Sequence, residues 1–169
     1  MRFSKNPSLN MENTNQMNIT ETYRITELLR RTFDGEPWYG PSVMDTLSDV
    51  TLEETLNQLP DSHTVAELVE HMIAWRTFAI KRLQGDTEFD VNQEASFVKI
   101  SAMTSELWRD MLQRLHQTQE ALLQILSQIS DEKLAQMVAG RNYTFDRLLH
   151  GVIHHDIYHS GQIVLLRKM

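Results

Sequence analysis

Histidines gather near the C-terminal end of the chain, where the stretch HHDIYHSGQ covers residues 154–162. His155 and His159 are four residues apart, which places their imidazoles about 40° apart and one turn apart on a helix. Two imidazoles in that arrangement can reach one metal ion. A third is available at His71, within the segment AELVEHMIAW. Three histidine ligands are typical of a reactive site for zinc, nickel or ferrous iron, with positions left open for water or substrate.

Packing is the simpler interpretation for each histidine taken alone. A buried neutral imidazole needs hydrogen-bond partners, and a core histidine usually finds them in other side chains. The three positions taken together leave two interpretations open, a metal site and a packed histidine cluster. His150, His154 and Asp156 fall on the flank of the same helix, away from the face of His155 and His159.

Three further residues are candidates for catalysis beside such a metal. Gln162 could hydrogen-bond a substrate or a metal-bound water, or satisfy backbone in a facing loop. Glu67, one turn before His71, could act as a general base or orient that ring. It could also simply be a first-turn carboxylate that the helix dipole favours. Tyr158 could donate a proton, or pack with a satisfied hydroxyl.

Four helical patterns are long enough to position these residues, and each carries an apolar stripe at helical spacing. They cover residues 19–33, 62–85, about 99–129 and 144–168. Short helices are expected at 51–59 and 130–138, while 34–44 and 86–97 are expected to be irregular connections. Runs of alternating β-branched residues are missing. The pattern predicts an all-α fold, a four-helix bundle with short extra helices in its connections.

The chain of 169 residues has the length of one domain. Residues 1–18 are rich in asparagine and serine and contain little that could pack, so we expect a flexible tail there. Residues 19–169 are expected to form the single domain.

Composition excludes several classes of function. There is no cysteine, so any metal must be held by histidine or carboxylates, and any thiol must come with a substrate. The formal net charge of -7 argues against nucleic acid as a partner, because phosphate binding needs clustered lysine and arginine. No apolar run approaches the roughly 18 residues that span a bilayer, and the N-terminal residues lack the apolar centre of a secretory signal. We therefore expect a cytoplasmic protein with no membrane partner.

Several of these stretches resemble the DinB superfamily, in particular its YfiT-like members. The pattern of the family has one histidine on the second long helix and a His-x-x-x-His-x-Gly-Gln signature on the last. These positions fall here on His71, His155, His159, Gly161 and Gln162. The turn GEPWYGPSV, the entry SHTVAELVEH and the exit KRLQG also match the habit of the family. The resemblance covers about residues 19–169.

The resemblance implies a four-helix bundle in up-down-down-up order, often paired as a homodimer. It also implies a divalent metal ion, zinc, nickel or iron, held by the three histidines with water completing the coordination. Characterised relatives include transferases that use bacillithiol or mycothiol, a maleylpyruvate isomerase and proteins described as metal-dependent hydrolases. We therefore expect an enzyme that transfers a low-molecular-weight thiol to an electrophilic small molecule. Hydrolysis of a small ester or amide, and metal or ligand binding without catalysis, stay open as alternatives.

Overall fold

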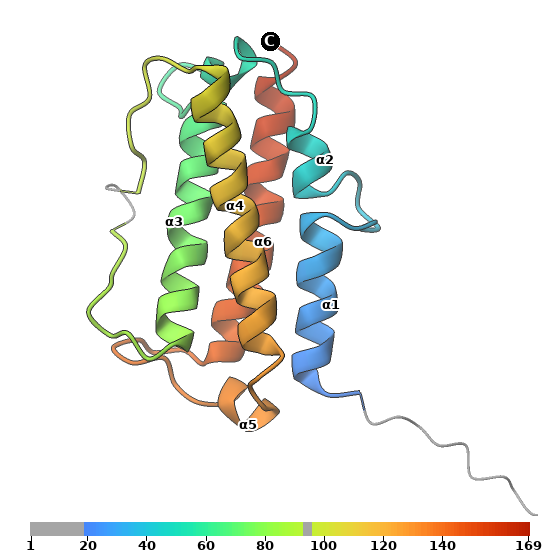
Figure 1. The fold of residues 1–169 in the computed structure, drawn as a ribbon, viewed down its shortest axis with the longest axis vertical. Coiled ribbons are helices and arrows are strands. Elements are labelled where there is room, and N and C mark those ends of the chain that lie inside the picture. Colours follow the sequence, from blue (N-terminus) through green and yellow to red (C-terminus); the bar gives the residue numbers. More distant parts are fainter. Residues whose placement is uncertain (1–18, 93–95) are drawn as a thin grey trace, which may run out of the picture.

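The computed structural model describes residues 19–92 and 96–169, which form helices joined by loops (Figure 1). These residues contain no β-strand, only an isolated bridge between Met137 and Thr144. The predicted all-α class is therefore confirmed. The flexible tail predicted for residues 1–18 lies outside the described residues. None of the described helices combines the length and apolarity needed to cross a membrane.

Among the described residues, four helices are long and three helical segments are short. The long ones are α1 (Glu21–Phe33), α3 (Val65–Leu83), α4 (Ser105–Leu126) and α6 (Phe145–Leu166). The short ones are α2 (Val43–Leu47), the 3-10 turn η1 (Glu54–Leu56) and α5 (Asp131–Leu134).

The long helices stand side by side, and Figure 1 shows α1 and α6 running in one direction and α3 and α4 in the other. Helix α3 packs against α4 and α6, and α1 packs against the same two helices. The connection between α3 and α4 returns along the length of α3 (Figure 1). This packing brings the middle of α3 next to the middle of α6, where the predicted histidines lie.

Each long helix begins after a threonine whose side-chain oxygen accepts a hydrogen bond from a first-turn backbone N–H. These N-cap residues are Thr20, Thr64, Thr104 and Thr144. Thr104 fixes the start of α4 six residues later than the predicted start near residue 99. The residues before it form an extended connection, in which the backbone N–H of Ile100 donates to Glu67 Oε1 over 3.1 Å.

The short elements differ most from the prediction. The helix expected over 51–59 is reduced to η1, and the one expected over 130–138 is reduced to α5. Conversely, α2 begins at the end of the stretch predicted to be irregular. Ser42 and Asp45 form a capping box there, in which each side chain accepts from the backbone N–H of the other residue. Local capping outweighs the helix-breaking glycines and prolines that precede it.

The core consists of two apolar clusters separated by a buried polar layer. One cluster includes Leu29, Phe78 and Leu149, and the other includes Met72, Leu115 and Ile163. The polar layer consists of four residues at the intermediate positions of α3, α4 and α6: Arg76, Thr118, Gln119 and Asp156. The histidines lie near this level on the side of α3 and α6.

Candidate metal centre

The three histidines predicted as ligands converge on one point between α3 and α6. His71 lies on α3, and His155 and His159 lie on α6. The ring centroids are 4.9 Å apart for His71 and His155, 4.9 Å for His71 and His159, and 4.3 Å for His155 and His159. One nitrogen from each ring lies within 4.8 Å of the other two. This cluster could hold a metal ion.

Hydrogen bonds at Nδ1 orient two of the rings. His159 Nδ1 lies 2.6 Å from Gln162 Oε1, and it carries the proton because that oxygen can only accept. His71 Nδ1 lies 2.7 Å from the hydroxyl oxygen of Ser96, which can accept in the same way. In the tautomer in which Nδ1 donates to these oxygens, each ring presents an unprotonated Nε2, the form in which a neutral imidazole binds a metal.

His155 supplies the third nitrogen. Its Nε2 lies 3.0 Å from His159 Nε2, and its Nδ1 is buried without a hydrogen-bond partner among the described residues. Packing and hydrogen bonds therefore do not satisfy the cluster completely, which is costly in a protein interior. The donor set fits a metal ion, because neutral imidazoles without thiolates suit zinc, nickel or ferrous iron.

Burial keeps these imidazoles neutral at physiological pH. Burial, and after it the charge of nearby His159, lowers the pKa of His71 to about 4. The same two causes lower the pKa of His155 to about 3. Burial also lowers the pKa of His159, although its hydrogen bond with Gln162 opposes the shift. A metal ion would therefore meet neutral imidazoles rather than imidazolium groups, as metal binding requires.

Without metal, the protein is expected to lose stability as the pH falls below about 6.5. The unfolded histidines take up protons near that pH, whereas folded His71 does so only near about 4 and folded His155 only near about 3. The unfolded state thus binds more protons in this window. The free energy of unfolding is expected to fall by up to about 1.4 kcal/mol per pH unit for each such histidine. Urea unfolding of chelator-treated protein across this window measures the slope.

Two neighbouring variants separate a histidine of the cluster from an exposed one on the same helix. His155→Asn removes a partly buried imidazole and is expected to reduce the slope by about one proton. His154→Asn removes an exposed imidazole from the same helix and serves as the control. If His155→Asn keeps the slope of the wild-type protein, the imidazole of His155 is not held neutral by burial.

The connection between α3 and α4 holds His71 from two sides. Ser96 binds its Nδ1, and the ring of Phe97 stacks on it with centroids 3.8 Å apart and an interplanar angle of 5°. Phe97 also stacks on His63, with centroids 3.5 Å apart and an angle of 1°. Ser96, Phe97 and His63 were not predicted from the sequence. Phe97 is one of two aromatic residues in the connection 86–97, and nothing in the pattern marks it as the one that contacts a histidine.

A cavity of about 590 Å³ opens beside the imidazoles. Its lining combines aromatic and apolar side chains with a few polar groups, as in small-molecule sites. The lining residues are His63, Leu68, His71, Trp75, Phe97, Tyr143, Arg147, Leu148, Gly151, Val152, His155, Tyr158, His159 and Gln162. Among the described residues, no aspartate or glutamate lines this cavity. Open space therefore adjoins the cluster that could hold a metal.

Two of the residues predicted for catalysis also line the cavity. Gln162 accepts from His159 and donates through its Nε2 to the Tyr158 hydroxyl over 3.3 Å. Gln162 would thus act on a metal bound here through the ring of His159. The side chain of Tyr158 is largely exposed, and its hydroxyl faces Gln162 rather than an imidazole.

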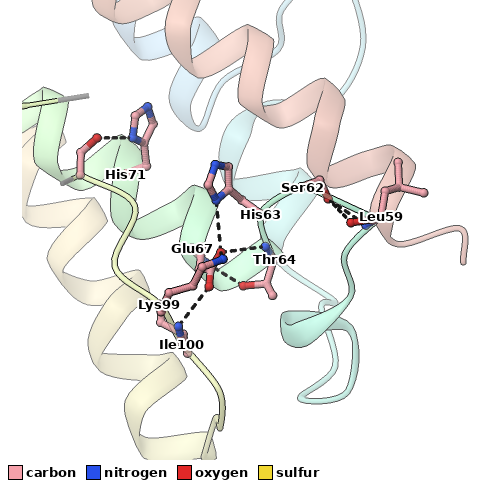
Figure 2. A network of polar contacts seen from close by, with 9 residues as sticks. Leu59, Ser62, His63, Thr64, Glu67, His71, Lys99 and Ile100 are labelled. Carbon is pink, nitrogen blue, oxygen red and sulfur yellow. Dashed lines mark hydrogen bonds and ion pairs between the residues drawn. The ribbon is translucent and has the colours of Figure 1, made fainter. Parts of the chain in front are cut away.

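Glu67 lies outside the lining of the cavity. Figure 2 shows its carboxylate among the side chain of His63, the backbone of Thr64 and Ile100, and the Lys99 ammonium group. Burial opposes its ionisation, but the N–H groups of Ile100 and Thr64 donate to it and lower its pKa overall. Glu67 therefore links the α3–α4 connection to the start of α3. It contacts the lining of the cavity through the side chain of His63.

A sequence model of the DinB superfamily matches residues 41–163, which is most of the chain and includes the three histidines. No curated protein and no solved structure matches the chain.

Proposed function

The chain belongs to the DinB superfamily, and from this premise we propose that it is a metal-dependent enzyme that transfers a low-molecular-weight thiol to an electrophilic small molecule. Membership of this family suggests a metal-binding protein, and the thiol and the reaction are our extension. The observation that carries the proposal is the convergence of three neutral imidazoles beside a cavity. Three protein ligands leave positions at a metal ion for a substrate.

The residues around the cluster orient its ligands and shield the site. Ser96 and Gln162 fix the rings of His71 and His159 through Nδ1, so that their Nε2 atoms face the common point. The indole of Trp75 packs edge-on against His71 and His155, with centroids 6.3 Å away from each. The indole of Trp75 therefore limits the access of water to this side of the two imidazoles.

A divalent ion held by His71, His155 and His159 would activate the thiol, because such an ion lowers the pKa of a thiol bound beside it. The sulfur of the thiol then forms a bond with the electrophilic carbon. The leaving group departs with the electron pair of the bond that breaks, and the proton of the thiol passes to solvent. This substitution reaction needs no oxidant and no reductant.

The nucleophile that thiol transfer uses is easier to ionise than water. A thiol has a pKa near about 8.5, so that a metal ion ionises it readily, whereas attack of hydroxide on an ester or amide usually also needs a general base nearby. No described lining residue is a carboxylate, and the Nδ1 of His63, a lining residue that could act as a base, faces Glu67 Oε2 over 3.3 Å.

Zinc-loaded protein is expected to accelerate the reaction of bacillithiol or a related thiol with monochlorobimane, which becomes fluorescent as chloride leaves. Chelation should remove the acceleration and added metal should restore it. The same preparation is expected to hydrolyse p-nitrophenyl acetate no faster than the background rate. Absence of turnover with bacillithiol, mycothiol, glutathione and cysteine at full metal loading would contradict the proposal, as would fast ester hydrolysis alone.

A further inference from the structure

The cavity continues from the imidazoles along α6 toward the N-terminal end of that helix. Arg147, Gly151 and His155 all line it, and they follow one another at intervals of about one helical turn. About 12 Å along the helix axis separate the Cα atoms of Arg147 and His155. A ligand that occupies both ends of the cavity is therefore elongated.

Arg147 is the charged group at the far end of the cavity. Its side chain is exposed and makes no ion pair or hydrogen bond with the described residues. The one hydrogen bond of Arg147 outside the helix pattern is a backbone bond, from its N–H to the Thr144 side chain. The adjacent Asp146 faces His150 instead, with 3.6 Å between Oδ1 and Nδ1. No carboxylate lines the cavity among the described residues, although the chain has a net charge of -7. The planar fork of this guanidinium fits a carboxylate of a ligand.

Gly151 lies between the two ends and has no structural requirement for glycine. It lies within α6 and is absent from the glycines with positive φ, and an added Cβ would have no neighbour within 4 Å. Glycine also disfavours a helix relative to alanine. The missing side chain leaves free space along the wall of the cavity between Arg147 and His155.

We propose that the site takes an elongated organic acid. Its carboxylate pairs with Arg147, its middle lies over Gly151, and its reacting group lies at the three imidazoles. This inference rests on the proposed function for the reacting end. It adds the chemical class of the substrate and two residues that determine specificity, Arg147 for charge and Gly151 for shape.

Monohydroxamates of linear dicarboxylic acids test the charged end, because a hydroxamate binds zinc whatever reaction the enzyme performs. Isothermal titration calorimetry on zinc-loaded protein is expected to show the free acid binding about tenfold tighter than its methyl ester once the spacer is long enough. Arg147→Gln should lower the affinity for the acid to that for the ester and leave the ester unchanged. Arg109→Gln removes an exposed charge from α4 outside the cavity lining and should preserve the difference.

The outcomes separate this inference from the proposed reaction. Equal affinity of acid and ester at every spacer length, or a difference that survives Arg147→Gln, overturns the inference. A difference that depends on Arg147, in a protein that transfers no thiol, supports the inference and contradicts the reaction. If no hydroxamate binds the zinc-loaded protein, the open position at the metal is missing and both fail.

Substitution of Gly151 tests the path between the two ends. Gly151→Leu is expected to weaken binding of the long acid by about tenfold or more while leaving acetohydroxamate, which is short, unchanged. Gly161 has no neighbour within 4 Å of an added Cβ either and lies outside the cavity lining, so that Gly161→Leu is the matched control. Gly151→Ala and Gly161→Ala should both raise the melting temperature by about 2–4 °C, because alanine favours the helix. Wild-type affinity of Gly151→Leu for the long acid would overturn the role of Gly151.

Discussion

His155→Ala is expected to reduce bound metal from about one ion per chain to almost none, under conditions that load the wild-type protein fully. The substitution removes one of three converging nitrogens and leaves only two imidazoles. Among the described residues, no other protein ligand replaces the lost nitrogen. Loss of a group that only orients a ligand costs roughly 10–100-fold in metal affinity, so loss of the ligand should exceed about 100-fold. Elemental analysis after dialysis measures the stoichiometry, and competition with a chelating dye measures the affinity.

The matched control is His154→Ala, which removes an exposed imidazole one residue away and should retain the metal. A second group of possible ligands makes the comparison decisive. Glu21, Asp146 and His150 also offer ligand atoms within 4.8 Å of one another, at partly exposed positions. If His155→Ala keeps its metal and His150→Ala loses it, the ion binds at that group and the site assigned to the three imidazoles is wrong.

Helical periodicity predicted the long helices and the faces on which the candidate ligands lie. The apolar stripe of α3 places His71 inward, and the four-residue spacing of His155 and His159 places both on one face of α6. These inferences depend only on geometry within one helix. The convergence of the three rings required a further assumption about helix packing, which contacts between α3 and α6 support.

Contacts made by the long connection were beyond the reach of periodicity. Ser96 and Phe97 hold His71, but their segment has no repeating pattern from which a position in space follows. The start of α4 was misplaced for a related reason, because Ile100 is bound to Glu67, 33 residues away, instead of continuing a helix. Non-local hydrogen bonds of this kind override local helix propensity.

Arg76 and Asp156 illustrate a second limit of sequence analysis. Asp156 was expected on the flank of α6, away from the face of the ligands, and rotation about a helix cannot show what that flank meets. The structure buries both side chains almost completely, with exposed fractions of 1% and 0%. Arg76 Nη2 donates to Asp156 Oδ2 over 2.6 Å and Nε donates to the same carboxylate, while Nη1 donates to Gln119.

Asp156→Ala is expected to lower the free energy of unfolding by about 3–5 kcal/mol, which is much of the stability of an ordinary domain. Burial raises the pKa of Asp156, and the Arg76 guanidinium opposes that shift by stabilising the carboxylate. Removal of the carboxylate leaves a buried guanidinium with only Gln119 and Thr118 as acceptors from its Nη1. Urea unfolding of the metal-free protein measures the loss, independently of any effect on the metal site.

Two comparisons show whether the cost comes from a stranded charge. Arg76→Met combined with Asp156→Leu removes both charges and should be far less destabilising than Asp156→Ala, because well-packed apolar residues can replace a buried pair at little cost. Glu70→Ala breaks the pair of Arg114 with Glu70, which joins α4 to α3 over 2.7 and 2.9 Å at a partly exposed position. Its expected cost is below about 1 kcal/mol, because water solvates the remaining guanidinium. If the double variant is as unstable as Asp156→Ala, the cost does not come from a stranded charge, and the pair contributes net stability of its own.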